Sequence, residues 1–216
     1  MSWRASGRGE RRGYHHGNLR EALVSAALEL IAARGPAGFT VAEAARQAGV
    51  SPAAPYRHFR DRDMLIADVA RRGYELFGER LAAASREGSP DALPALMRLG
   101  RAYLDFARTE PAYYAAMFES GLAIADHPEC RAAADRAFAA LQEACERIAA
   151  GMPAGARPPS TMMALHVWSF SHGIASLFAR GDAARRPLPM SPEDLLEAGV
   201  LVYLDGLRAG RAPAAA

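Results

Sequence analysis

The sequence contains no lysine and only two cysteines. All 26 basic residues of the 216-residue chain are arginines, which we interpret as nucleotide-composition bias, and the abundance of alanine agrees with this. Two cysteines are too few to form the disulfide framework of a small secreted domain. This low number fits a reducing cytosol, so we expect a cytoplasmic protein. The N-terminal residues are rich in arginine but lack an apolar stretch, so we expect no signal peptide.

One long stretch, residues 158–179, lacks Asp, Glu and Arg. It contains His166, His172 and several hydroxyl groups, which are costly in hydrocarbon. We therefore expect a helix buried between other helices and no contact with a membrane.

Catalytic and metal-binding patterns are also missing. The chain has no glycine-rich phosphate loop, no serine nucleophile elbow and no zinc-ligand spacing. Cys130 and Cys145 would lie ~22 Å apart on one straight helix, beyond disulfide reach, and both fall on an apolar stripe. His166 and His172 are six residues apart and cannot share a helix face. We expect no catalytic residue, cofactor or metal site, and two buried cysteines.

Positive charge is concentrated near the N-terminus. Residues 1–62 hold ten arginines and five acids, a net charge of +5, whereas residues 63–216 hold sixteen arginines and nineteen acids, a net charge of −3. This asymmetry indicates a polyanionic partner for the first third of the chain. The alternative is a solvated charged face.

Apolar residues recur at spacings of three and four, and strand-like alternation is rare. The sequence therefore predicts an all-α protein of about nine helices, separated by Gly and Pro. We expect a flexible basic arm at 1–17, a first helical domain at 18–64 and a second helical domain at 65–216. The expected helices start at Asn18, Thr40 and Ser51, run over 61–84 and 91–109, restart at Pro111, and run over 129–150, 161–180 and 192–208.

Residues 40–59 carry the pattern of a helix-turn-helix. Thr40 and Glu43 form a capping-box pair, and Gly49 suits a left-handed turn. Ser51 can cap a second helix with Pro52 at its first position. This spacing lets two short helices pack nearly perpendicular to each other. A generic helical hairpin is the alternative.

In a helix-turn-helix the second helix enters the DNA major groove. The three small apolar residues that lead it can approach thymine methyl groups, and the polar side chains that follow can reach phosphates. Base discrimination would rest on Arg57 and Gln47 together with DNA shape, whereas Phe59 is expected in the core. The candidate DNA-binding residues are Thr40, Gln47, Ser51, Ala53, Ala54, Pro55, Tyr56, Arg57, His58 and Arg62.

Glycine, aromatic and helix-capping residues form one combined pattern between Gly35 and Leu65. The first helix ends at Gly35, followed by Phe39-Thr40, Ala44-Ala45, Ala48-Gly49-Val50-Ser51, Tyr56-Arg57-His58-Phe59, and Asp63 to Leu65. In these features residues 18 to about 65 resemble the DNA-binding domain of TetR/AcrR-type regulators. Two positions depart from the family pattern. Arg62 replaces the usual Lys and keeps a phosphate contact, and Pro55 replaces a larger apolar residue, which affects the geometry of the second helix.

The rest of the chain resembles the helical ligand-binding domain of that family more loosely. Trp168, His172 and Gly173 are similar to the Trp-His-Gly signature of one C-terminal subgroup. The resemblance implies a homodimer formed by the last two long helices and a small-molecule pocket in each subunit.

Apolar stripes on those two helices supply the candidate dimer interface, and aromatic and Met side chains with a few polar tips supply the candidate pocket. For both sets the alternative is plain intramolecular core. The candidate interface residues are Met163, Val167, Phe170, Ile174, Leu196, Val200, Tyr203 and Leu207. The candidate pocket residues are Tyr103, Phe106, Tyr113, Met117, Phe118, Met162, Trp168 and His172.

These expectations describe a homodimeric repressor that binds a palindromic double-stranded DNA operator and is released by a small hydrophobic or aromatic effector. Two alternatives are open. One is a constitutive DNA-binding dimer without an effector, which a fully packed C-terminal domain would favour. The other is a helical ligand-binding protein or enzyme with a vestigial helix-turn-helix.

Overall fold

The computed structural model describes residues 19–87, 91–154, 157–179 and 189–209. All regular elements of this part of the chain are helices, which confirms the predicted all-α class. They are α1 (Leu19–Arg34), α2 (Val41–Gln47), the 3₁₀ helix η1 (Ala54–Arg57), α3 (Arg62–Arg86), α4 (Ala92–Thr109), α5 (Pro111–Phe118), the 3₁₀ helix η2 (Ile124–Asp126), α6 (Pro128–Ala150), α7 (Ser160–Ala179) and α9 (Pro192–Arg208). The predicted arm at 1–17 and the predicted cap at Asn18 lie outside the described residues.

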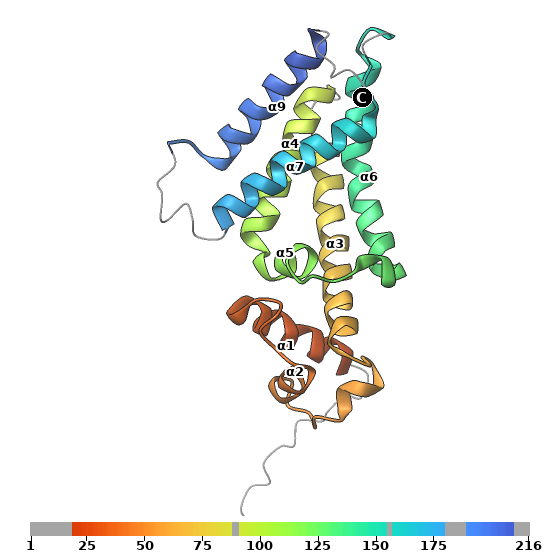
Figure 1. The fold of residues 1–216 in the computed structure, drawn as a ribbon, viewed down its shortest axis with the longest axis vertical. Coiled ribbons are helices and arrows are strands. Elements are labelled where there is room, and N and C mark those ends of the chain that lie inside the picture. The colour runs from red at the N-terminus through yellow and green to blue at the C-terminus, as the bar shows by residue number, and fades with distance from the viewer. Residues whose placement is uncertain (1–18, 88–90, 155–156, 180–188, 210–216) are drawn as a thin grey trace, which may run out of the picture.

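The molecule has a small lower body and a larger upper body, joined by one long helix (Figure 1). The lower body contains α1, α2 and η1, and α3 runs from it into the upper body, where it packs against α4, α5 and α6. The predicted domain boundary at 64–65 therefore falls in the first turn of a continuous helix. Any rotation of α3 would move the lower body with it.

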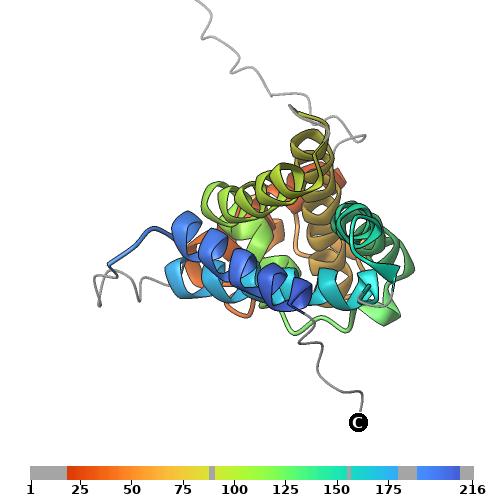
Figure 2. The ribbon, with the colours of Figure 1, turned by 90° about the horizontal axis from the view of Figure 1, so that it is seen from above.

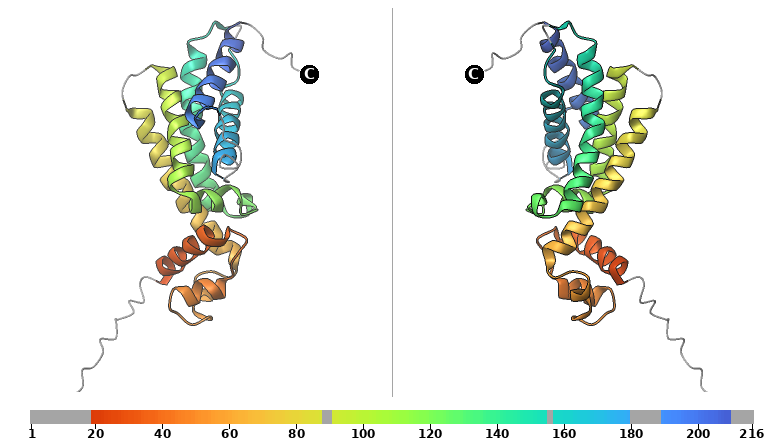
Figure 3. Two further views of the ribbon diagram at one scale, coloured as in Figure 1. Left: turned by 90° about the vertical axis from the view of Figure 1, so that its left-hand side faces the viewer. Right: turned by 90° about the vertical axis from the view of Figure 1, so that its right-hand side faces the viewer.

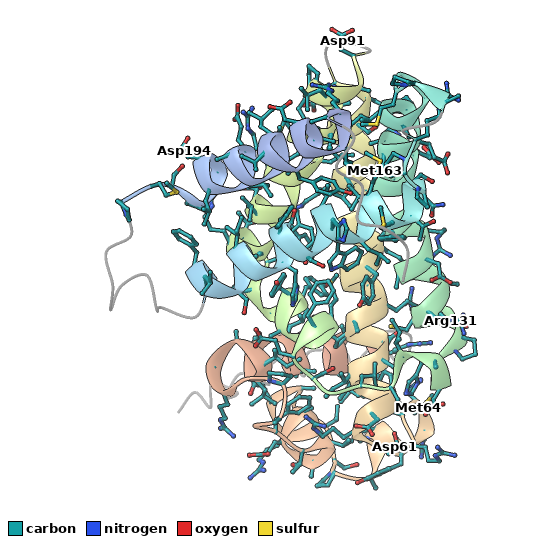
Figure 4. The ribbon with its side chains drawn as sticks, turned by 45° about the horizontal axis from the view of Figure 1, so that its top comes forward. Asp61, Met64, Asp91, Arg131, Met163 and Asp194 are labelled. Atoms are coloured by element: carbon teal, nitrogen blue, oxygen red, sulfur yellow. The ribbon has the colours of Figure 1, made fainter. Side chains whose placement is uncertain are left out.

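Local capping signals set several of the helix boundaries. Gly35 ends α1 with a φ of 76°, a left-handed conformation that glycine adopts without strain. Asp61 caps α3 by accepting a 2.9 Å hydrogen bond from the backbone of Met64, and Ser191 caps α9 in the same way. Figure 4 shows that Asp61 lies at the lower end of the molecule and that Asp91, just before α4, lies at the opposite end.

Helices α7 and α9 lie on one side of the upper body. Seen from above they lie next to each other along one edge of the upper body, and both side views agree (Figures 2 and 3). Within the chain α7 packs against α4 and α6, and α9 packs against α4 and α7. In the described part, no helix is both long and apolar enough to span a membrane.

This packing corrects most of the predicted dimer interface. Six of the eight candidate side chains are buried inside the chain, because the faces that carry them are pressed against α4, α6 and each other. They are Met163, Val167, Ile174, Leu196, Val200 and Leu207. Only Phe170 and Tyr203 keep accessible surface.

Candidate nucleic-acid interface and effector site

The helix-turn-helix is built as the sequence predicts up to its turn. Thr40 accepts a 3.2 Å hydrogen bond from the backbone of Glu43, whose carboxylate accepts a 2.9 Å bond from the backbone of Thr40. Gly49 has a φ of 72°, as expected for a left-handed turn. Val50 is half-buried against the core, and its backbone donates to Ala45 at 2.9 Å. The turn therefore fixes where the next segment begins.

The segment after the turn is a single 3₁₀ turn and not the regular helix predicted from Ser51. Pro55 has no backbone N–H, so the first i→i−4 hydrogen bond of a regular α-helix that begins at Ser51 cannot form. Ser51 accepts a 3.0 Å bond from the backbone of Ala54 through its main-chain carbonyl, and η1 has no side-chain cap. With this change the described chain holds eight α-helices and two 3₁₀ helices, whereas about nine helices were predicted.

The outer face of this segment is open to solvent. Tyr56 is 57% exposed, and Arg57 and His58 beside it are also exposed. Phe59 is buried, as predicted for a core anchor. The predicted DNA-binding residues that are exposed are Thr40, Gln47, Ser51, Ala53, Tyr56, Arg57 and His58.

The other three predicted DNA-contact residues are partly or fully buried. Ala54 is half-buried. Pro55 is buried, so it presents no surface to a duplex and the prediction for it is corrected. Arg62 donates to the backbone carbonyl of Pro36, and its guanidinium lies 5.4 Å from the centre of the Phe39 ring. Arg62 thus ties the start of α3 to the loop after α1, and a phosphate contact by it stays a prediction.

Arg46 is a candidate that the sequence reasoning missed. It is exposed in the last turn of α2, and like Arg57 it makes no ion pair within the described residues. Other arginines of the lower body are paired: Arg34 with Glu43 at 2.9 Å, for example. Arg46 directly precedes the predicted contact residue Gln47, and this position was the signal that could have indicated it. Unpaired cations on an exposed helix-turn-helix surface are suited to phosphate contacts.

A buried carboxylate joins the lower body to α3. Asp68 accepts hydrogen bonds from Arg20 of α1 at 3.1 and 2.9 Å and from Arg71 at 2.9 Å, and Arg72 lies 3.3 Å away. Arg72 also pairs with Glu21 of α1. Burial opposes the ionisation of Asp68, but the hydrogen bonds from Arg20 and Arg71 outweigh it, so the pKa of Asp68 is lowered. The carboxylate is therefore charged at neutral pH.

The upper body holds a cluster of aromatic rings around His172. The hydroxyl groups of Tyr103 and Tyr114 lie 3.0 and 2.9 Å from Nδ1 of His172. The rings of Phe118 and Trp168 pack against Tyr103, with centroids 6.5 and 6.1 Å away. Helices α4, α5 and α7 thus bring four of the predicted pocket residues together.

The other four pocket predictions lie at the edge of this cluster or outside it. Phe106 reaches it through Phe77, with ring centroids 4.9 Å apart. Tyr113 and Met117 pack on α3 at Gly73. Met162 is half-buried in the first turn of α7, apart from the ring contacts.

Tyr114 was missed from the sequence. Its spacing of four residues from Phe118 on α5 was the signal that could have found it, because residues so spaced share a helix face.

The space beside the aromatic cluster is small. A slit between α3, α4, α6 and α7 has a volume of about 10 Å³, roughly the room of one water molecule. Its lining residues include Tyr103, Trp168, Ser171, Gly100 and Ala137. The candidate effector site is therefore closed in this conformation.

Comparison with known proteins agrees with this architecture. Residues 23–69 match the family model of bacterial regulatory proteins of the tetR family, and residues 96–203 match that of the tetracyclin repressor-like C-terminal domain. The chain is 30% identical over 100 residues to YobS, an uncharacterised HTH-type transcriptional regulator of Bacillus subtilis (strain 168). That match spans 46% of this chain and about half (51%) of YobS.

Solved structures extend the likeness to most of the chain. A protein of unknown function from Rhodococcus sp. RHA1 is 27% identical, with a TM-score of 0.75 over 91% of this chain and 99% of the other. The TetR-family regulator PfmR from Thermus thermophilus shares the fold at 20% identity, with a TM-score of 0.62 over 88% and 98% of the two chains. The match to the Trp-His-Gly subgroup stays a prediction. With both family models matched in order, and with the helix-turn-helix and the C-terminal helical domain that they describe, this chain belongs to the TetR family of transcriptional regulators.

Proposed function

We propose that the protein is a homodimeric repressor that binds a palindromic DNA operator and releases it when a small hydrophobic or aromatic effector enters the upper body. The observation that carries the DNA-binding part is the exposed surface of the helix-turn-helix. Tyr56, Arg57 and His58 are exposed in and just after η1, and Arg46 is exposed at the end of α2 and makes no ion pair within the described residues.

The dimer is supported by the outer face of α7 and α9. Several large apolar side chains on this face are exposed in the single chain, and an exposed apolar patch marks an interaction surface. They are Leu165, Phe170 and Leu177 on α7 and Leu201 and Val202 on α9. Tyr203 links the two helices by a 3.0 Å hydrogen bond to His166 and by ring contact with Phe170. A four-helix seam with a second copy would cover this patch.

A two-fold dimer is also what a palindromic operator requires. Two recognition elements about 34 Å apart can enter successive major grooves on one side of a duplex. Phe170 and Tyr203 remain part of the proposed interface, and the exposed residues of the same helices replace the six buried ones.

Effector response would act through α3. This helix carries the lower body at one end and packs against the effector cluster at the other. An effector that favours a different packing of α3 would change the spacing of the two helix-turn-helix units. A bias of ~1–3 kcal/mol between the two packings changes operator affinity about 5–150-fold.

The closed slit favours a second candidate, a constitutive DNA-binding dimer. With room for about one water molecule, the slit beside the aromatic cluster is not a preformed site for an effector. The two candidates differ in whether any small molecule changes operator affinity. For the effector model the closed state is the resting state, and the cost of opening lowers the apparent affinity.

Selection of bound DNA from random duplexes tests the proposal, with sedimentation equilibrium on the same protein. A palindromic consensus together with a dimer mass is the expected result. An asymmetric site, a monomer, or no retention of DNA at low salt would contradict it. Screening small molecules for release of the selected operator then separates the effector model from the constitutive one.

A further inference from the structure

A hollow of about 380 Å³ opens on the lower body beside the segment that follows the turn. The first residue of α1, the turn after α2 and the first part of the segment 51–58 enclose it. Its lining residues are Leu19, Gly49, Val50, Ser51, Ala53, Ala54 and Arg57. Ser51, Ala53 and Arg57 are exposed and belong to the predicted DNA-contact residues. The hollow therefore lies on the surface that is proposed to meet the duplex.

The walls of the hollow are mostly apolar. Leu19 and Val50 are half-buried and pack against the core, so each keeps part of its side chain at the surface of the hollow. Ala53 and Ala54 add two methyl groups. None of the lining residues is an acid, and one serine and one arginine are the lining residues whose side chains form hydrogen bonds. An apolar group therefore fits against these walls better than a polar one.

Backbone hydrogen bonds hold the hollow in shape before DNA binds. The backbone of Val50 donates to Ala45 at 2.9 Å, and the backbone of Ala54 donates to the carbonyl of Ser51 at 3.0 Å. Gly49 leaves one side open, because a Cβ added to it would have no neighbour within 4 Å in the described chain. A preformed hollow loses little conformational entropy when it is occupied.

Thymine is the DNA base whose major-groove edge carries an apolar group, its 5-methyl group. Cytosine in the same place would offer an amino group, which would lose water against these walls without gaining an acceptor. Arg57 also lines the hollow, is exposed, and makes no ion pair within the described residues. Its guanidinium is suited to the N7 and O6 atoms of a guanine. The hollow and Arg57 together match a thymine next to a G·C base pair.

We infer that each half-site of the operator contains a thymine whose 5-methyl group enters this hollow, beside a base pair whose guanine is bound by Arg57. Leu19, Val50 and Ala53 are the specificity-determining contacts for that methyl group. Two of them, Leu19 and Val50, lie outside the predicted DNA-contact residues. This inference rests on the proposed DNA-binding function and names the base feature that the hollow recognises.

Replacement of thymine by uracil tests the inference, because it removes the 5-methyl group and leaves the hydrogen-bonding edge of the base unchanged. The duplex is the site selected from random DNA, and each thymine of one half-site is replaced in turn. We expect one position at which uracil weakens binding about fourfold, the effect of one buried methyl group. That position should adjoin the one at which Arg57→Ala relaxes the base preference. Fluorescence anisotropy with the full chain measures both.

Variants of the hollow show whether its walls read the methyl group. Leu19→Ala removes one wall and Ala53→Val fills part of the space, so in both the ratio of thymine to uracil affinity should fall to near unity. Leu28→Ala is the matched control, because Leu28 is half-buried in the same helix and packs on the core but does not line the hollow. It should keep the fourfold ratio. A ratio measured on one preparation does not depend on its folded fraction, so reduced stability cannot imitate the effect.

Three outcomes would overturn this inference. They are an unchanged affinity with uracil at every position, a half-site without thymine beside the Arg57-dependent base pair, and a fourfold ratio that persists in Leu19→Ala or Ala53→Val. In each of these cases the wild-type chain still binds the selected site, so the proposed DNA-binding function stands. A wild-type chain that retains no DNA at low salt would instead overturn the proposed function itself.

Discussion

Arg20 of α1 and Asp68 of α3 are joined by two hydrogen bonds of 3.1 and 2.9 Å, although 48 residues separate them in the chain. The bidentate geometry fixes the angle at which the first helix meets the long one. Because Arg72 of α3 also pairs with Glu21 of α1, the joint between the DNA-binding end and the upper body is stiff. A stiff joint is what a regulator needs if a change at one end of α3 is to move the other.

Replacement of Asp68 by Asn should destabilise the protein by about 2 kcal/mol, because the charge-assisted hydrogen bonds are lost. The lowered pKa of Asp68 also predicts a pH effect. A carboxylate with a depressed folded-state pKa contributes stability above its ordinary value of 3.8 and loses it as pH falls through the folded value. Wild type should lose this contribution below about pH 4, and the variant should lack it. Urea unfolding across pH 2–6 measures both effects.

Asp63→Asn is the control for that change. Asp63 is exposed in the same helix and, in the part of the chain that the structure describes, pairs only with Arg62, at 3.4 Å. An exposed pair contributes little, so the control should stay within about 0.5 kcal/mol of wild type. Equal losses in the two variants would show that Asp68 does not join the domains as described.

The unpaired arginines of the helix-turn-helix should divide into two roles. Arg46→Ala should weaken binding to all sequences alike and lower the salt-dependence slope by about 1, as loss of one phosphate contact does. Arg57→Ala should in addition relax the base preference at one position of each half-site. Fluorescence anisotropy with the selected operator and a scrambled duplex, over a salt series, measures both.

Arg86→Ala is the control for Arg46→Ala and Arg57→Ala. Arg86 is exposed in the last turn of α3, at the far end from the helix-turn-helix, and makes no ion pair within the described residues. Its replacement should leave affinity and slope unchanged. A drop equal to that of Arg46→Ala would mean that net charge alone explains the effect.

Much of the DNA-binding end could be predicted from local signals. The Thr40 capping box, the turn at Gly49 and the buried Phe59 each depend on residues a few positions apart, and all three are as expected. The inward turn of Arg62 depends on Pro36, which lies 26 residues away, and no local signal indicates it. The shortening of the recognition segment to a 3₁₀ turn depends on the missing backbone donor at Pro55.

The packing of the upper body was harder to predict from the sequence, because its helices are apolar on more than one face. On α7, Met163 and Val167 face the core while Leu165 and Phe170 face outward, and periodicity alone does not say which set packs inside. Burial of one set depends on the positions of α4 and α6. Figure 4 shows labelled Met163 on α7, one of the side chains that are fully enclosed in the single chain.

The two cysteines should be inert in the folded protein. Both are buried, and burial raises the pKa of Cys130 to about 11 and that of Cys145 to about 12. At pH 8 the thiolate, which is the reactive form, is then ~0.1% of Cys130 or less. We expect no labelling by iodoacetamide at pH 8 and labelling of both in urea, measured by mass spectrometry. Fast labelling of the native protein would mean that α6 opens locally.

The exposed α7–α9 face supplies the sharpest test of the dimer. Val202 is 74% exposed in the single chain, so Val202→Asp should leave the folded subunit intact but place a charge in the seam between two copies. The expected outcome is a monomer by sedimentation equilibrium, an unchanged helical circular dichroism spectrum, and operator affinity reduced to that of a single half-site. Met64→Asp adds the same charge at an exposed apolar residue of α3, away from α7 and α9, and should remain dimeric. A dimeric Val202→Asp protein would place the interface elsewhere.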